Sequence, residues 1–409
     1  MNKILTVRYF YFLSVYLVMA TIFGLSFTWS FPPGLVLAIT AFVALLYKSC
    51  YSTKVGDTQK KCILLISLWY LYSVLISGSD IILQFFINLL NFIVIYSVIS
   101  LPINNKTYLL HFITRATSIL LCISLFFWFL FLIGIPLPNS GEMIHNDNYH
   151  SYVNYYFFIM SPKDFLILPR FFGMFKEPGH VASICVLLIL ANIDNVKKKL
   201  FDIIVFAISL ILSFSLAGWV VMALAIFMLA MFKGKYKILG LVGVLIIFGT
   251  LYYVSQTNEN SVVNEYIFDR LVYDESTGIV GNNRTDYNFE SRFQNYIKTS
   301  YVWFGISSQL KQGYDWTVGC AGWKVTIVHS GIMGFALINI ILLAIYLFYK
   351  SKHGFIFFIS YLILCYIRAY YTNPYWLYIF LIALPYLHER TDINKLKNNK
   401  YEKKIKSTL

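Results

Sequence analysis

Long runs of apolar residues dominate the chain, and short polar stretches separate them. Many runs hold about 17 to 20 residues, the length at which a helix spans the hydrocarbon core of a bilayer. Backbone groups in lipid must be satisfied within their own segment, and the runs do not alternate as the strands of a membrane barrel would. The pattern predicts an all-α polytopic membrane protein. Its candidate spans are residues 9–29, 32–48, 61–77, 80–100, 112–135, 178–194, 200–214, 216–232, 237–254, 322–350, 354–370 and 374–388.

Two polar segments, residues 136–178 and 255–320, are much longer than the turns between the other spans. Loops of this length are usually functional or disordered, and their many aromatic residues favour folded, functional loops. Within the second, apolar residues recur every four positions over 286–301 and predict an amphipathic helix, which can lie flat on the membrane surface. The expected regions are spans one to five (1–135), the first outer loop (136–178), spans six to nine (179–254), the second outer loop (255–320), spans ten to twelve (321–389) and a basic cytoplasmic tail (390–409).

The composition agrees with a membrane protein, because 58% of the residues are hydrophobic and only 13% are charged. The net charge of +14 would suggest nucleic acid in a soluble protein. Here most of the 33 lysines and arginines fall in alternate segments between the spans, which places both termini in the cytoplasm. The charge is therefore explained by topology and by contact with membrane lipid headgroups, and we expect no nucleic-acid partner. The run from Tyr9 to Phe27 lacks a convincing cleavage site and is interpreted as a span rather than a signal peptide.

The six cysteines have no paired spacing, and most lie in apolar runs or at their cytoplasmic ends. We therefore expect no disulfide, no metal site and no cofactor.

The first candidate site closes the first outer loop and enters a span. Pro178 suits the first turn of a helix, where a missing N–H costs nothing. Glu177 precedes it, where the helix dipole favours an anion. With Arg170, Lys176 and His180, these residues gather ionisable groups at the outer membrane boundary, which favours a functional site. A capped helix with charges that anchor it at the interface is an equally good interpretation of the spacing alone.

The second candidate is Arg284, which lies between flexible Gly and Asn residues and the predicted amphipathic helix. Arginine presents a rigid fork of donors that suits phosphate oxygens. A solvated loop arginine is the commoner situation. Neither outer loop is net basic, so an anionic ligand would have to be held by particular arginines.

The third candidate runs from Ala321-Gly322-Trp323-Lys324 to His329 and the pair Gly331 and Gly334. Small residues permit close helix contact. For His329, a packed intramembrane histidine is favoured over a catalytic base. Arg368, near the outer end of the eleventh span, either snorkels to the interface or faces a cavity.

Taken together, these segments resemble one superfamily of bacterial membrane enzymes. Residues 170–178 resemble the arginine–glycine–glutamate–proline signature of Wzy-type O-antigen and capsule polymerases. Asn283-Arg284-Thr285 with Trp303-Phe304-Gly305 resembles the second-loop pattern of the superfamily, which also contains the O-antigen ligases. Residues 321–324 with the Gly331-x-x-Gly334 pair resemble the segment that re-enters the membrane in that group. The motifs cover about 50 residues, and their order and spacing carry the resemblance.

The resemblance implies a metal-independent glycosyltransferase of the GT-C class in the bacterial inner membrane. Its partners would be undecaprenyl-diphosphate-linked glycan donor and acceptor, and a chain-length regulator protein. Glu177 would be the general base, with His180 assisting. Arg170 and Arg284 would stabilise the diphosphate leaving group. The residues expected to bind substrate are Arg170, Lys176, Arg284, Arg292, Lys324 and Arg368.

Two departures from the superfamily patterns bear on the choice between its members. The arginine–ten residues–glycine pattern of some polymerases is not met from Arg170, since the matching position is Val181. The ligases carry a histidine about eleven residues before the Gly-x-x-Gly pair, and that position is Cys320 here. The second departure favours a polymerase over a ligase. A flippase for lipid-linked oligosaccharides is the alternative from another class, but transporters place charged groups and broken helices at the bilayer midplane.

Overall fold

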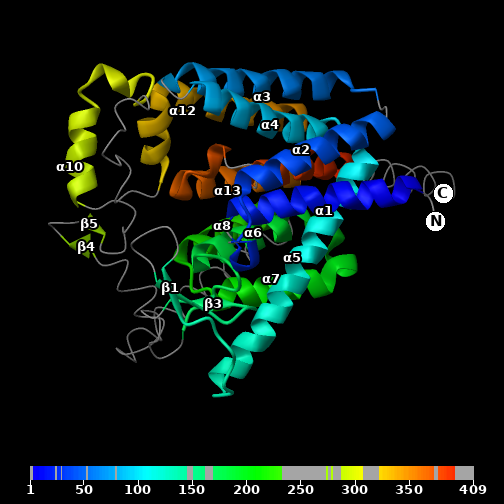
Figure 1. Ribbon diagram of the computed structural model, residues 1–409, viewed down its shortest axis with the longest axis vertical. Coiled ribbons are helices and arrows are strands. Elements are labelled where there is room, and N and C mark those ends of the chain that lie inside the picture. Colours follow the sequence, from blue (N-terminus) through cyan, green and yellow to red (C-terminus); the bar gives the residue numbers. More distant parts are fainter. Residues whose placement is uncertain are drawn as a thin grey trace, which may run out of the picture.

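Helices account for most of the computed structural model, and each predicted span within the described part of the chain overlaps one of them (Figure 1). The structure describes residues 3–23, 25–28, 30–51, 54–78, 81–144, 151–161, 169–232, 273–274, 278–279, 287–306, 322–372 and 376–391. The predicted span 237–254 therefore lies outside the described residues.

The helices that overlap predicted spans are α1 (Lys3–Phe23), α2 (Pro33–Cys50), α3 (Asp57–Leu75), α4 (Ile81–Ile99), α5 (Ile103–Leu132), α6 (Pro178–Ala191), α7 (Leu200–Leu212), α8 (Leu216–Phe232), α12 (Trp323–Phe348), α13 (Lys352–Arg368) and a last helix over residues 376–391. Among the described residues, α2, α4, α5 and α12 are long and apolar enough to cross a membrane. A fifth span results if α6 and the segment through α7 count as one, although a bend of 95° separates them. The helical membrane class is confirmed, and the count of twelve crossings stays a prediction.

The helices pack as two neighbouring groups. In one group α1 packs on α2, α2 on α4, α4 on α3, and α3 on α12. In the other group α6 contacts α7, α8 and α13. Helix α5 crosses the bundle obliquely and contacts both α1 and α7, so it joins the groups (Figure 1).

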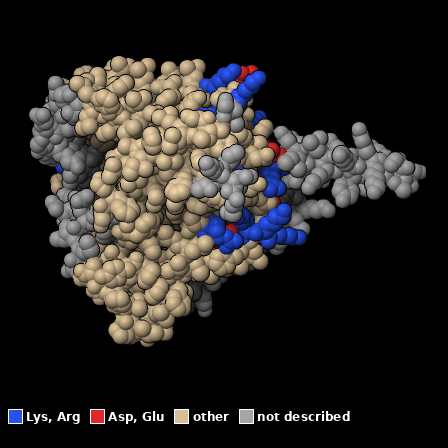
Figure 2. Space-filling view, turned by 45° about the vertical axis from the view of Figure 1, so that its right-hand side comes forward, with Lys and Arg blue, Asp and Glu red and all other residues tan. Residues whose placement is uncertain are grey.

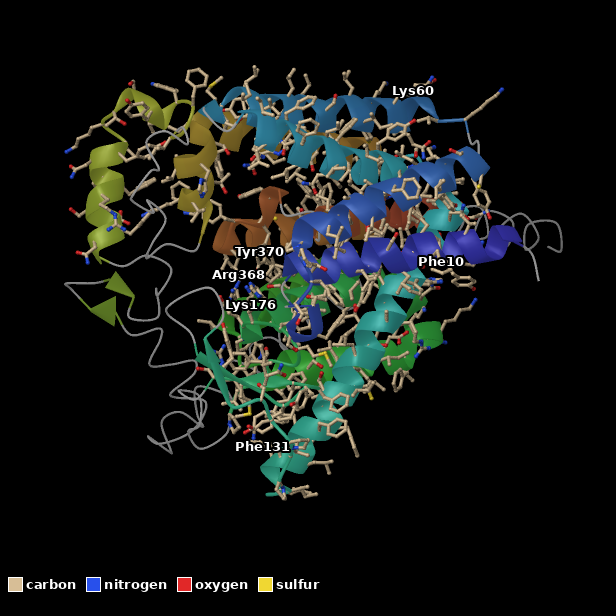
Figure 3. The ribbon with its side chains drawn as sticks, in the orientation of Figure 1. Phe10, Lys60, Phe131, Lys176, Arg368 and Tyr370 are labelled. Carbon is tan, nitrogen blue, oxygen red and sulfur yellow. The ribbon has the colours of Figure 1, made fainter. Side chains whose placement is uncertain are left out.

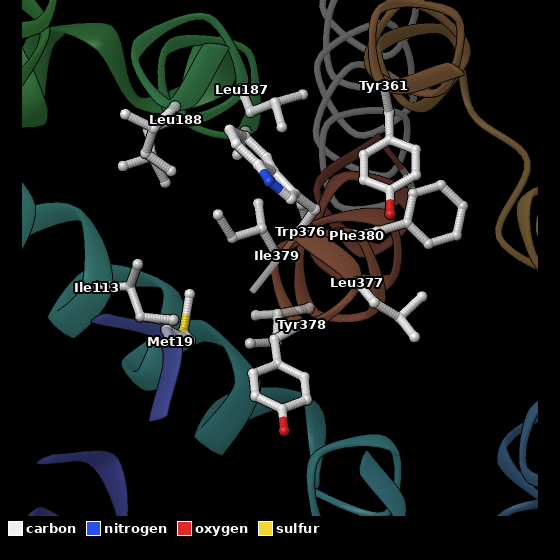
Figure 4. Close-up of a cluster of buried hydrophobic side chains, with 14 of the residues drawn as sticks. Met19, Ile113, Leu187, Leu188, Tyr361, Trp376, Leu377, Tyr378, Ile379 and Phe380 are labelled. Atoms are coloured by element: carbon white, nitrogen blue, oxygen red, sulfur yellow. The ribbon is translucent and has the colours of Figure 1, made fainter. Parts of the chain in front are cut away.

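The centre of the bundle is formed by α6 and the helix over residues 376–391. Residues 376–387 are all buried, and so are residues 181–191 except Ile189. Figure 4 shows side chains of both helices, among them Leu187, Leu188 and Trp376, meeting in one apolar cluster. A helix that is apolar on every side belongs in such a core. With 14 residues α6 is about 21 Å long, against about 30 Å for a bilayer core.

Lysine and arginine side chains gather on one side of the molecule (Figure 2). Lys60, near the start of α3, lies toward the same end of the bundle as the start of α1, while Lys176 and Arg368 lie away from it (Figures 1 and 3). This separation agrees with the predicted cytoplasmic face. Which side of a membrane that face occupies stays a prediction.

The first outer loop contains β-structure that the sequence analysis did not predict. Strands β1 (Glu142–Ile144), β2 (Ser151–Asn154) and β3 (Ile159–Met160) form an antiparallel sheet in the order β1-β2-β3. The sheet is anchored on α5, because Phe127 stacks on Phe157 at 4.2 Å and the Ser124 hydroxyl donates to the Phe157 carbonyl at 2.6 Å. The described part of this loop is folded, as expected, but the expectation of a purely helical protein was incomplete.

The second outer loop contributes a short hairpin, β4 (Tyr273–Asp274) with β5 (Gly278–Ile279), and the helix α10 (Tyr287–Tyr296). The predicted amphipathic helix is thus present but ends five residues earlier. Its apolar residues Phe289, Phe293 and Tyr296 are buried in a cluster with Ile327 and Val328 of α12. The apolar face of this helix packs on α12, and its position along a membrane surface stays a prediction.

Candidate functional site

The segment before α6 is fixed by backbone hydrogen bonds to three different elements. The Phe171 amide donates to the Leu212 carbonyl at the end of α7, and the Gly173 carbonyl accepts from Ile159 of β3. The Met174 carbonyl accepts from the amide of Ser26 in η1 (Ser26–Thr28), which follows α1. Gly173 adopts a φ of 54°, which glycine tolerates without strain. The candidate residues on either side of this stretch are thereby held in place by the fold.

Arg170 caps the end of α7. Its Nε and Nη2 atoms donate to the carbonyls of Ser213 and Phe214, each at 3.2 Å. A cation is favourable at a helix C-terminus, where carbonyls lack helical partners. Arg170 therefore has a structural role, and its predicted contact with a diphosphate stays a prediction.

Glu177 and Arg368 form an ion pair between the start of α6 and the end of α13, in which Arg368 Nη1 donates to Glu177 Oε2. The Arg368 side chain is only 8% exposed, whereas that of Glu177 is 41% exposed. His180 packs on Tyr370 with ring centroids 5.7 Å apart, and Tyr370 in turn stacks on Trp376 at 4.5 Å. Figure 3 shows Lys176, Arg368 and Tyr370 at one end of the bundle. Glu177 and His180 belong to the same group, because they contact Arg368 and Tyr370.

A second ion pair joins α10 to the first turn of α12. Lys324 donates to Glu290 Oε2, and its Nζ lies 5.0 Å from the centroid of the Phe293 ring. Burial opposes ionisation of Glu290, but hydrogen bonds from Lys324 and Gln294 outweigh it and lower the pKa of the Glu290 carboxyl below its ordinary value. Arg292 is on the same helix, 6.0 Å from the ring centroid of its neighbour Phe289. The structure therefore places Lys324 against the helix that carries Arg292, and adds Glu290, which the sequence analysis did not single out.

The two ion pairs are neighbours, because the start of α12 lies against the end of α13. A Cβ atom on Gly322 would lie 3.4 Å from the Ile367 carbonyl oxygen, one residue before Arg368. Trp323 stacks on Tyr366 with ring centroids 5.3 Å apart. The candidate site is thus a strip that runs from α6 across α13 to α12 and α10.

The Gly-x-x-Gly pair marks a break in α12. Gly331 has a φ of 67°, and a Cβ atom there would lie 2.2 Å from the Trp303 carbonyl oxygen. That carbonyl accepts from the Met333 amide, and the Ile306 amide donates to the Val328 carbonyl at 2.9 Å. The Trp303-Phe304-Gly305 motif therefore packs directly into the break, which explains why both segments need glycine.

Two tyrosine hydroxyls donate to backbone carbonyls at this break. Tyr296 of α10 donates to the Ile327 carbonyl at 3.0 Å, and Tyr72 of α3 donates to the Ser330 carbonyl. Carbonyls that leave the helical ladder are thus satisfied by protein groups. His329, expected as a packed intramembrane residue, is exposed.

Arg284 lies outside the described residues, so its predicted convergence with Arg170 stays a prediction. Two residues of the site went unnoticed in the sequence, Glu290 and Gly179, whose role is described below. The only signal for Gly179 was a glycine in the first turn of a span, directly after Glu177-Pro178. Within the described residues, no group of three His, Cys, Asp or Glu side chains gathers to hold a metal ion.

Comparison with protein-family models, curated proteins and solved structures found no match.

Proposed function

We propose that this chain is a membrane glycosyltransferase that polymerises undecaprenyl-diphosphate-linked repeat units into O-antigen or capsular polysaccharide, on the outer face of a bacterial inner membrane. The observation that carries the proposal is the half-exposed carboxylate of Glu177, held at one end of the buried helix α6 beside Lys176 and His180. A positioned carboxylate and cations at the depth of lipid headgroups suit a reaction between a sugar hydroxyl and a lipid-linked diphosphate.

In the proposed reaction, a hydroxyl of the acceptor repeat unit attacks the anomeric carbon of the donor glycan. The bond between that carbon and the diphosphate oxygen breaks, and undecaprenyl diphosphate leaves with the electron pair. Glu177 accepts the hydroxyl proton. Arg170 and Arg284 stabilise the charge on the leaving group, and Lys176 contributes a further cation. The twelve crossings, the cytoplasmic termini and the absence of a cofactor belong to the same proposal.

Two features support this proposal over a flippase. Along α6, Val181, Ala182 and residues 184–188 are buried in the apolar core, so this central helix presents mainly apolar side chains where a flippase would need a polar path. A broken helix is a mark of many transporters, where the freed backbone groups coordinate substrate or ions. In α12 the carbonyls of Ile327, Val328 and Ser330 are occupied by protein groups instead.

The test is deletion of the gene in its own strain. A polymerase deletion should leave surface glycan as single repeat units on its acceptor, and the full-length gene should restore polymer. Loss of all surface glycan, including single units, would contradict the proposal and indicate a flippase or a ligase.

A further inference from the structure

The Arg368 guanidinium lies against the first turn of α6 at Gly179, where only glycine leaves room for it. A Cβ atom at Gly179 would lie 2.0 Å from Arg368 Nη2 and 2.7 Å from Cζ. No side chain therefore fits at residue 179 while the guanidinium stays where it is. Glycine is less favourable than alanine in a helix, and close approach of the arginine gives a physical reason for glycine here.

The Glu177 side chain is directed at this guanidinium rather than at its own helix. Glu177 is the N-cap residue of α6, with extended backbone angles of φ −143° and ψ 145°, but its side chain makes no capping hydrogen bond. Glutamate is also not among the favoured capping residues. Pro178 favours the backbone angles of the first helical turn. The Glu177 carboxylate pairs with Arg368 instead of capping the helix.

The two side chains differ in exposure, and therefore in what they can contact. Arg368 is nearly covered and a buried guanidinium needs a compensating charge, which Glu177 supplies. The carboxylate, being far more exposed, is the member of the pair that a ligand can reach. Arg368 was expected from the sequence to bind substrate directly, but its burial favours an indirect role.

We infer that Arg368 is a positioning residue, which acts on the substrate through Glu177. Glycine is required at position 179 to leave room for the guanidinium. This inference rests on the proposed function, since it concerns how the proposed base is oriented and kept ionised. The guanidinium binds carboxylate oxygen Oε2 and so fixes the direction in which the Glu177 carboxylate faces the acceptor hydroxyl. Lys176, the adjacent cation, is then the better candidate for direct contact with the diphosphate.

The first experiment measures polymerisation by purified full-length protein in lipid vesicles, with lipid-linked repeat units from the deletion strain as substrate. Arg368→Gln should lower the rate about a hundredfold, as misplacing a reacting group by an ångström can do. It should also move the acid limb of the pH profile upward by about one unit, because the carboxylate loses the charge that favours its ionised form. Arg368→Lys should retain part of the rate and the original limb. Gly179→Ala should lower the rate about tenfold by displacing the guanidinium.

Two matched controls come from elsewhere in the chain. Arg115→Gln removes the arginine of another ion pair, with Asp202, far from this site, and should leave the pH profile unchanged. Gly34→Ala adds a methyl group where no atom lies within 4 Å, and should leave the rate unchanged. An unmoved acid limb in Arg368→Gln would overturn the positioning role and reduce the pair to a structural link.

A second measurement tests the Glu177–Arg368 ion pair independently of the polymerisation reaction. In a thermal-unfolding cycle without substrate, Glu177→Gln and Arg368→Gln should be strongly non-additive, because each removes the same interaction. Additive losses would overturn the inference whatever the activity. If the cycle shows coupling but the wild-type protein forms no polymer, the proposed function is wrong while the ion pair stands.

Discussion

Ion pairs link helices at both ends of the bundle, and the two ends bury opposite charges. Near α6 and α13 the cation Arg368 is buried and the carboxylate of Glu177 is exposed. At the other end Asp202 of α7 is fully buried, while its partner Arg115 of α5 is 48% exposed at an N–O distance of 3.0 Å. One end therefore offers a carboxylate to whatever approaches, and the other offers a cation.

The difference matters because burial decides which member of a pair is available for chemistry. The exposed Arg115 suits a face that meets anionic headgroups. The exposed Glu177 has no such use at a lipid surface, which favours a functional role for it. Ionisable residues near a membrane boundary therefore belong to different classes, although sequence alone would treat them alike.

The contrast between the two ends of the bundle requires that they face opposite sides of the membrane. Reporter fusions after about residues 150 and 290 should report the outside, and fusions near residues 197, 235 and 395 the cytoplasm, because lysine and arginine remain inside. The result is all or none at each position. A cytoplasmic signal at residue 290 would contradict the twelve-span topology.

Glu177→Gln should give the largest graded effect. The amide keeps the shape of the side chain but cannot accept a proton, so polymer formation should fall by roughly a hundredfold or more. Polymer length in the complemented deletion strain, at matched membrane abundance, is the measurement. Normal polymer from this variant would remove Glu177 from the reaction and leave His180 or substrate-assisted deprotonation.

Asp202→Asn should lower the stability of the protein and leave its polymerisation activity unchanged. The buried carboxylate accepts from the Ser118 hydroxyl at 2.5 Å as well as pairing with Arg115. Since Arg115 is half-exposed and can be solvated when unpaired, we expect a loss of about 2 kcal/mol, below the usual cost of breaking a fully buried pair. Thermal unfolding measures the loss. Altered polymer length at matched abundance would show that the two ends are coupled.

Lys324→Gln should give the smallest effect, because both members of the Lys324–Glu290 pair are partly exposed. We expect a loss of at most about 1 kcal/mol at neutral pH. The pKa of Glu290 is lowered in the folded protein, so the pair contributes stability above the ordinary value of 4.5 and loses it as the pH falls through the lower folded value. Melting temperatures of wild type and variant should therefore differ at pH 7 and converge in acid, once the pH is below the lowered pKa of Glu290. A difference that persists in acid would mean that the lysine acts through packing on Phe293.

The sequence by itself determined where the helices lie. Apolar runs of the right length predicted each helical span in the described chain, because a segment in lipid must satisfy its own backbone. It also predicted α10 from the spacing of Phe289 and Phe293, and the approach of backbones at Gly331, since both signals are local. The three-stranded sheet went unpredicted, because strands of two to four residues leave little periodicity to detect.

Only the tertiary structure decided what each charged residue does. Glu177 and Arg368 are 191 positions apart, and no local pattern records that the end of α13 returns to the start of α6. Likewise Arg170 proved to cap α7 through two carbonyls, a task that depends on which helix ends nearby. The physical reason is that hydropathy and helix signals act between neighbours in the chain, whereas burial and ion pairing depend on which helices pack together.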